Sequence, residues 1–192
     1  MVPAYQGPLR HEPLAVELHN TLYASHGTAI DGLAESRSAE AWLETIADRL
    51  PAGGSGRGPA RDELIALRRV VREALHAAIE DGTPSRATLD ALNRASGRAP
   101  RSLAARWSKH GPPIREERFH GASRADIVIS VLAADAIDLV TGTNRSLLRV
   151  CGASGCVLMF LKSHPRREWC SPGCGNRARQ ARHYRRIREQ QA

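Results

Sequence analysis

The chain reads Cys151-Gly-Ala-Ser-Gly-Cys156, then thirteen residues, then Cys170-Ser-Pro-Gly-Cys174, and these four cysteines are its only ones. Two close cysteine pairs joined by a short segment are the pattern that a tetrahedral zinc ion requires. Each pair forms one chelating turn, and the segment between them folds back to bring the turns together. The sequence therefore predicts one structural Zn²⁺ bound by Cys151, Cys156, Cys170 and Cys174, with no open coordination position for catalysis.

Two disulfides in a secreted protein, or a redox-active or catalytic thiol site, are alternative uses of four cysteines. The N-terminus, Met1-Val-Pro-Ala-Tyr5, has no basic flank followed by an apolar run, so no secretory signal is visible. The most apolar stretch, 127–140, contains three polar residues and is shorter than the roughly 20 residues that a membrane span needs. We therefore expect a cytoplasmic protein without a membrane segment, in which zinc is favoured over disulfides.

The net charge of +8 is concentrated at the C-terminal end. Residues 162–192 hold nine positive and two negative residues, which leaves about +1 for the first 161 residues. A near-neutral body joined to a compact basic end is typical of proteins that bind a polyanion, and nucleic acid is the usual partner. Because 26 of the 28 positive residues are Arg, a base-composition bias is enough to explain the choice of Arg over Lys.

Apolar periodicity predicts a mainly α fold, with an N-terminal helical bundle. Aromatic residues make up only 4% of the chain, so the core must come from Leu, Ile, Val and Ala, which favours helices. The helix over 123–141 is apolar almost all round and is expected at the centre of the bundle. Pro112-Pro113 separates two strand-like stretches, which predicts a small β-hairpin from 103–107 and 114–119. The other expected helices cover 11–25, 38–50 with Ser38 as its cap, 61–80, and the segment from Pro84 to Ser96.

The second cysteine pair is expected at the start of a basic helix. Ser171 can cap such a helix and Pro172 suits its first turn. The apolar run 157–161 is strand-like and can supply the small core of a treble-clef-like finger, with Trp169 packed over the metal turn. The prediction at this end is thus a short strand, a metal knuckle and a basic helix.

Arginines dominate the surface of that helix. Its packing stripe is formed by residues spaced by three, Ala178, Ala181, Tyr184 and Ile187. Arg suits bidentate contacts with phosphates and guanine edges. The candidates for nucleic-acid binding are therefore Arg177, Arg179, Arg182, Arg185, Arg186 and Arg188. A solvated basic tail without a specific target is the alternative.

The C-terminal motif closely resembles the CGNR zinc finger, which is named for the tetrapeptide that stands here as Cys174-Gly175-Asn176-Arg177. In that family the finger follows a helical ABATE domain, and the proteins are described as stress-induced transcription regulators. The segment Leu14-Ala-Val-Glu-Leu-His-Asn20-Thr21 resembles the opening motif of that domain, and Ser38-Ala-Glu-Ala-Trp42-Leu43 fits its second helix. The resemblance implies an ABATE-like domain over residues 1–146 and a CGNR-type finger over 147–190.

Three residues of the motif have expected roles of their own. At Gly175 a side chain would crowd the turn near the metal. Asn176 is expected to bond a cysteine sulfur or the knuckle backbone, or else to contact nucleic acid. Arg177 is expected either to pair with Glu168 or to reach a phosphate.

These features favour a zinc-dependent, DNA-binding transcription regulator of bacterial type, whose N-terminal domain senses a small ligand or mediates dimerisation. One small finger contacts few base pairs, so a sequence-specific protein is expected to be a homodimer. Asn20 is the residue that we would test first in a ligand pocket, although capping or bonding a neighbouring backbone is the favoured use of its amide. An RNA- or protein-binding finger is the second hypothesis; RNA ranks lower because the helix offers only Tyr184 for stacking. We do not expect an enzyme, since no catalytic residues fall at a recognisable spacing.

Overall fold

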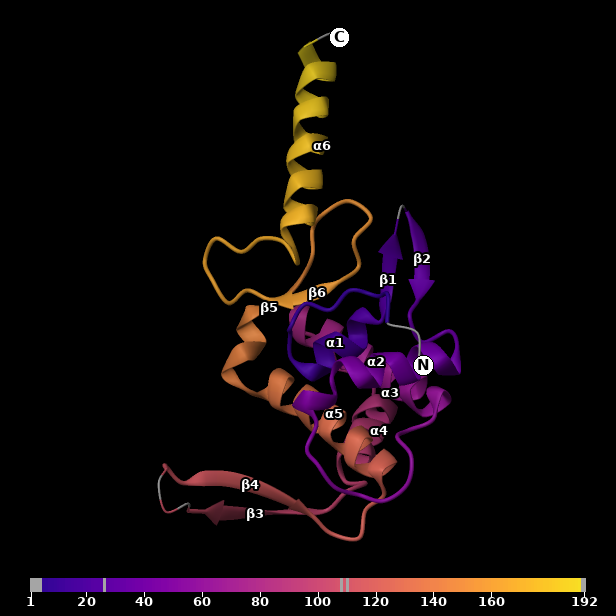
Figure 1. The fold of residues 1–192 in the computed structure, drawn as a ribbon. Coiled ribbons are helices and arrows are strands. Elements are labelled where there is room, and N and C mark those ends of the chain that lie inside the picture. The colour runs from indigo at the N-terminus through magenta and orange to yellow at the C-terminus, as the bar shows by residue number, and fades with distance from the viewer. Residues whose placement is uncertain (1–4, 26, 108, 110, 191–192) are drawn as a thin grey trace.

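The computed structural model describes residues 5–25, 27–107, 109 and 111–190, and Figure 1 shows their arrangement. The body is a helical bundle, and three small antiparallel strand pairs are attached to it. The helices are α1 (Leu14–Asn20), α2 (Ser36–Thr45), α3 (Arg61–Ile79), α4 (Arg86–Ser96), α5 (Arg124–Thr141) and α6 (Pro172–Gln190), with 3₁₀ turns η1 (Ala47–Arg49) and η2 (Thr143–Leu147). The strand pairs are β1 (Leu22–Ser25) with β2 (Thr28–Asp31), β3 (Arg101–Arg106) with β4 (Ile114–Phe119), and β5 (Leu148–Val150) with β6 (Met159–Leu161). The predicted mainly α fold class is confirmed.

Helix α5 forms the centre of the bundle, as its apolar composition predicts. It packs against α1, α3 and α4, and it buries residues on most of its circumference. Its first turn is capped by Ser123, whose hydroxyl accepts a hydrogen bond from the backbone N–H of Asp126 at 3.1 Å. Asp135 accepts a hydrogen bond from the backbone N–H of Ala15 at 2.8 Å and so joins α5 to the start of α1.

The helix predicted over 11–25 is wrong at both ends. Helix α1 ends at Asn20, and the chain turns into strand β1, which pairs with β2 in the register Tyr23↔Ile30. The Thr21 hydroxyl donates to the carbonyl of Leu18 at 2.7 Å, and Thr21 accepts from the backbone of Gly32 at 2.7 Å, so both of its bonds favour a turn rather than a further helical residue.

The other predicted elements are present with shifted ends. Helix α2 begins at Ser36 after Glu35, so Ser38 lies inside it rather than at its cap, and it ends at Thr45 before η1. Helices α3 and α4 match the prediction closely, and β3–β4 is the predicted hairpin with a longer first strand. In the part of the chain that the structure describes, none of the helices combines the length and the hydropathy that a membrane span requires.

Two parts project from the bundle at opposite ends (Figure 1). Helix α6 leaves one end beyond β5 and β6, and the β3–β4 hairpin leaves the other. This arrangement places the cysteine segment between the bundle and α6.

Candidate metal centre and basic helix

The four cysteine sulfurs lie within 4.8 Å of one another. Cys151 follows β5, Cys156 precedes β6, and Cys170 and Cys174 stand on either side of the first residues of α6. The Sγ–Sγ distances are 3.8 Å from Cys156 to Cys170 and 3.4 Å from Cys170 to Cys174. A tetrahedral ion with Zn–S bonds of about 2.3 Å separates its sulfurs by roughly 3.8 Å, so this donor set fits zinc.

Local backbone bonds shape both chelating turns. In the first turn Cys151 N–H donates to the carbonyl of Leu158 at 2.8 Å, Cys156 N–H donates to that of Ala153 at 2.9 Å, and Gly155 has a φ of 71°. In the second turn the Ser171 hydroxyl accepts from the backbone N–H of Cys174 at 3.3 Å, which confirms its predicted capping position. Both turns are therefore set by short-range interactions.

The contact between the Cys156 and Cys170 thiols shifts the pKa of both groups. Hydrogen bonds from neighbouring thiols, that of Cys170 first, lower the pKa of Cys156 to about 5. The same contact with Cys156 raises the pKa of Cys170. Zinc binds thiolates, so the affinity of this site for zinc depends on pH.

A small apolar cluster supports the metal turns. Leu158, Phe160 and Ala153 are buried beside the cysteines, and the half-buried Trp169 packs against them. Trp169 lies between two glycines: a Cβ at Gly152 would stand 3.4 Å from its ring, and one at Gly175 only 2.9 Å. The predicted position of Trp169 is correct, and the crowding expected at Gly175 comes from this indole ring.

Within the described finger, Arg177 and Asn176 make contacts other than the expected pair with Glu168 and the expected bond to a cysteine or the knuckle, and their contact with nucleic acid stays a prediction. The Arg177 guanidinium donates to the sulfur of Cys174 at 3.1 Å, so Arg177, and not Asn176, contacts a cysteine. Asn176 is exposed and its amide oxygen accepts a hydrogen bond from Arg179. The reason is geometric, because three residues along a helix bring Arg177 over Cys174.

Two buried side chains of the body occupy the free edge of β6. The Asn20 amide donates to the carbonyl of Met159 at 3.0 Å and accepts from its backbone N–H at 2.9 Å. Two residues further on, Leu161 N–H donates to the Glu12 carboxylate at 2.9 Å. The amide of Asn20, the residue that we would test first in a ligand pocket, is thus satisfied by backbone groups of the protein, which is the use favoured for it, and the side chain is completely buried.

Arg167 completes this junction. It forms an ion pair with Glu12, donates to the carbonyl of Leu161 at 3.0 Å, and lies 4.8 Å from the ring centroid of Phe160. Glu12 is only 4% exposed. Glu12 and Arg167 are not predictable from the sequence, since the two partners lie 155 residues apart and no local pattern marks them.

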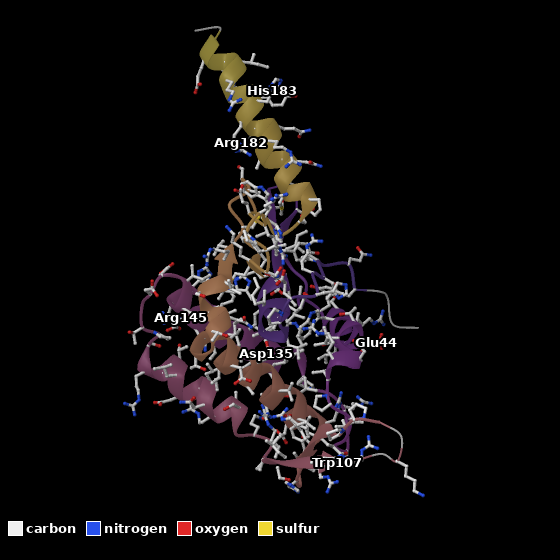
Figure 2. All side chains as sticks on the ribbon, turned by 90° about the vertical axis from the view of Figure 1, so that its left-hand side faces the viewer. Glu44, Trp107, Asp135, Arg145, Arg182 and His183 are labelled. Carbon is white, nitrogen blue, oxygen red and sulfur yellow. The ribbon has the colours of Figure 1, made fainter. Side chains whose placement is uncertain are left out.

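Most of the arginines that are predicted to bind nucleic acid lie on the projecting part of α6. Figure 2 labels Arg182 and His183 on this helix, beyond the cysteine segment. The side chain of Arg185 lies outside the described part of the chain. The stripe residues are exposed or half-buried, with Tyr184 67% exposed, so the stripe does not pack against the body. The exposed arginines are Arg177, Arg179, Arg182, Arg186 and Arg188.

Comparison with known families agrees with this geometry. Residues 12–143 match the ABATE family model, described as "Putative stress-induced transcription regulator", and residues 148–187 match the CGNR zinc finger. Neither is an enzyme family. None of the curated proteins searched matches the chain. The chain therefore belongs to the ABATE family and carries a C-terminal CGNR zinc finger, which with its four clustered cysteines holds one structural zinc ion.

Proposed function

We propose that this protein is a zinc-dependent, DNA-binding transcription regulator. In this proposal residues 1–146 act as the regulatory body, residues 147–190 act as the DNA-binding finger, and Cys151, Cys156, Cys170 and Cys174 are the four zinc ligands. The zinc ion fixes the start of α6, and the finger has no catalytic task. The expected cytoplasmic location stays a prediction.

The projecting arginine helix is the observation that carries the proposal. Helix α6, which has 19 residues, extends away from the body (Figure 1). Its arginines recur along its whole length after Asn176. A helix of this kind gains little from burial and its like charges repel one another. A polyanion removes that repulsion, and the major groove of DNA admits one α-helix. Phosphate contacts would supply most of the affinity, and one or two arginines would read bases.

A sequence-specific version of this protein requires more than one finger. Two copies would place two α6 helices on neighbouring half-sites, because a single short helix reads few base pairs. We therefore propose a homodimer on DNA. Light scattering of the protein with and without a cognate duplex tests this; a monomer in both samples contradicts it.

Ligand sensing has a better location than Asn20. A cavity of about 570 Å³ lies between α2, the segment before α3, and α5. Its lining includes the apolar Leu43, Leu50 and Val128 together with the charged Glu44 and Arg57. We propose that a small, largely apolar ligand with one polar group binds here. A ligand found by thermal shift should lose its effect in Ala47→Leu, which narrows the cavity from an exposed position.

The DNA-binding proposal is tested by fluorescence anisotropy of the zinc-loaded protein. The probes are a duplex from upstream of its own gene, a shuffled duplex, and an RNA of equal length. Tighter binding to the upstream duplex that a chelator abolishes supports a regulator, and Arg182→Ala with Arg186→Ala should weaken it at least tenfold. Equal binding to all three probes that vanishes in modest salt contradicts sequence-specific regulation, and preference for the RNA would favour the alternative of an RNA-binding finger.

A further inference from the structure

The β3–β4 hairpin, with its turn, is a second projecting part, here called the arm (residues 101–119). Hydrogen bonds at its base join its two strands to each other: His120 N–H donates to the carbonyl of Pro100 at 3.0 Å, and the side chains of Ser102 and His120 lie 2.8 Å apart. Eight of its twelve strand residues are exposed, so no layer of the bundle covers it. A two-stranded ribbon is marginally stable by itself, and the core does not account for its length.

Exposed apolar side chains gather on this arm. Among the described residues six large hydrophobic side chains are exposed, and three of them belong to the arm. Leu103 is 64% exposed, Trp107 70% and Ile114 47%. Figure 2 shows Trp107 at the end of the molecule opposite Arg182 and His183. Such a concentration on a small element indicates a contact surface.

The arm is also a separate basic region. Residues 101–119 contain five positive and two negative residues, a net charge of +3, whereas the segments outside the arm and residues 162–192 sum to −2. No Asp or Glu occurs from residue 101 to residue 115. Within the described part of the chain, the ion pairs of Glu116 and Glu117 engage other arginines of the arm, and none holds Arg106 or Lys109. The unneutralised charge therefore lies around the outer half of the ribbon.

The register shows that both faces of the ribbon are used. Leu103 lies opposite Glu117 and shares its face with Ala105 and Arg115, while Ile114 lies opposite Arg106 on the other face. The apolar residues consequently do not form one stripe that a flat protein surface would cover. A groove that encloses the ribbon would contact the apolar and the cationic residues of both faces together.

We propose that the arm is a second DNA-binding element, which inserts into a groove of duplex DNA and contacts phosphates through Arg106 and Lys109. The major groove admits a two-stranded ribbon as well as a helix, and the charge of the outer arm is complementary to the phosphates. Trp107 packs against the sugar edge of the groove. Because the arm and α6 leave opposite ends of the molecule (Figure 1), the arm binds a different DNA segment from the one on α6. The protein then bridges two segments. DNA binding by the arm does not require α6 to bind DNA, whereas the bridging of two segments rests on the proposed function of α6.

The test uses the full-length, zinc-loaded protein and two duplexes, one attached to beads and one fluorescent. The wild type should retain the fluorescent duplex on the beads, and Arg106→Ala with Lys109→Ala should reduce that capture at least tenfold. The matched control, Arg69→Ala with Arg94→Ala, removes two exposed positive charges from the body and should capture within twofold of the wild type. Thermal unfolding of each variant shows whether it has kept its fold.

A second measurement isolates the arm from α6. In protein that already carries Arg182→Ala and Arg186→Ala, the remaining affinity for one duplex should fall at least fivefold when Arg106→Ala and Lys109→Ala are added. The slope of log affinity against log salt should fall by about 2, as expected for two lost phosphate contacts. A third outcome is that Arg106→Ala with Lys109→Ala lowers the affinity for one duplex and Arg182→Ala with Arg186→Ala does not. This outcome would contradict DNA binding by α6 and leave the arm as the DNA-binding element.

Two results would overturn the proposal. The first is that the variant with Arg106→Ala and Lys109→Ala captures as much fluorescent duplex as the wild type, and that its affinity for one duplex has the same salt dependence. The second is a fall in molar mass by light scattering when Arg106 and Lys109 are replaced, which would make the arm an interface between copies of the protein.

Discussion

Asn20 and Met159 are 139 residues apart in the sequence, yet the Asn20 amide makes both hydrogen bonds of the Met159 backbone on the free edge of β6. The side chain takes the place of a neighbouring strand, because it offers one donor and one acceptor at the spacing of a peptide group. The finger is thereby hydrogen-bonded to the body through its own main chain. These two bonds explain why the polar side chain of Asn20 is buried at the end of α1.

Asn20→Ala is expected to destabilise the zinc-loaded protein by about 2–4 kcal/mol, since it leaves a buried N–H and a buried carbonyl without partners. Urea unfolding of the zinc-loaded protein measures this change. Asn93→Ala on the exposed face of α4 is the control and should change the unfolding free energy by less than about 0.5 kcal/mol. Equal effects of the two changes would contradict a junction role for Asn20.

Arg167→Ala is expected to lower the free energy of unfolding by about 3 kcal/mol, because it leaves Glu12 buried without its ion-pair partner. Its neighbour Arg166 is exposed, so Arg166→Ala removes the same charge and should have little effect. Combining Arg167→Ala with Glu12→Gln should recover part of the loss, since the buried charge is removed as well. A double-mutant cycle by urea unfolding checks this, and strict additivity would argue against the pair.

The contrast between these residues and the cysteines shows what the sequence can predict. The zinc site, the Ser171 cap and α5 follow from patterns within about twenty residues, and each was predictable. Glu12 and Asn20 bind partners more than a hundred residues away, so nothing in their own neighbourhood reveals the pairing. The overlong helix over 11–25 has the same origin, since the bonds of Thr21 to Leu18 and Gly32 outweighed a helical apolar spacing.

Arg177→Ala is expected to weaken zinc binding about tenfold, because the guanidinium donates a hydrogen bond to the sulfur of the zinc ligand Cys174 and holds it in place. Competition with a chromophoric zinc chelator measures the affinity. Arg179→Ala is the matched control two residues along α6, and it should leave the zinc affinity unchanged because Arg179 bonds Asn176 instead. A loss of DNA affinity in Arg177→Ala at saturating zinc, with normal zinc affinity, would assign Arg177 to phosphate contact.

Gly175→Ala is expected to destabilise the finger by about 1–3 kcal/mol, because the new Cβ would stand 2.9 Å from the Trp169 ring. Gly173→Ala lies in the same helical turn, where the nearest atom would be 3.8 Å away, and it should be neutral or stabilising since Ala favours helix. Thermal unfolding followed by tryptophan fluorescence compares the two. The structure would be contradicted if Gly173→Ala were the more damaging change.

The protein should lose stability in acid through His19. This ring is completely buried, with Nδ1 3.1 Å from the Asn20 amide oxygen and Nε2 3.2 Å from the Arg72 guanidinium. Burial, and then the charge of Arg72, lower the pKa of His19 from 6.5 to about 3. The neutral ring donates from Nδ1 and accepts at Nε2, whereas a protonated ring would face the cationic Arg72 with a second donor.

The sign of the pH dependence follows from which state binds the proton. Between pH 6.5 and 3 the unfolded chain protonates His19 and the folded protein does not, so stability falls as the pH falls, by up to about 1.4 kcal/mol per pH unit. His19→Gln should remove this slope, and the exposed His183→Gln should keep it. Comparing urea unfolding of each variant with the wild type at each pH cancels the acid release of zinc, which all three proteins share. Parallel curves for His19→Gln and the wild type would mean that the ring already binds a proton in the folded state.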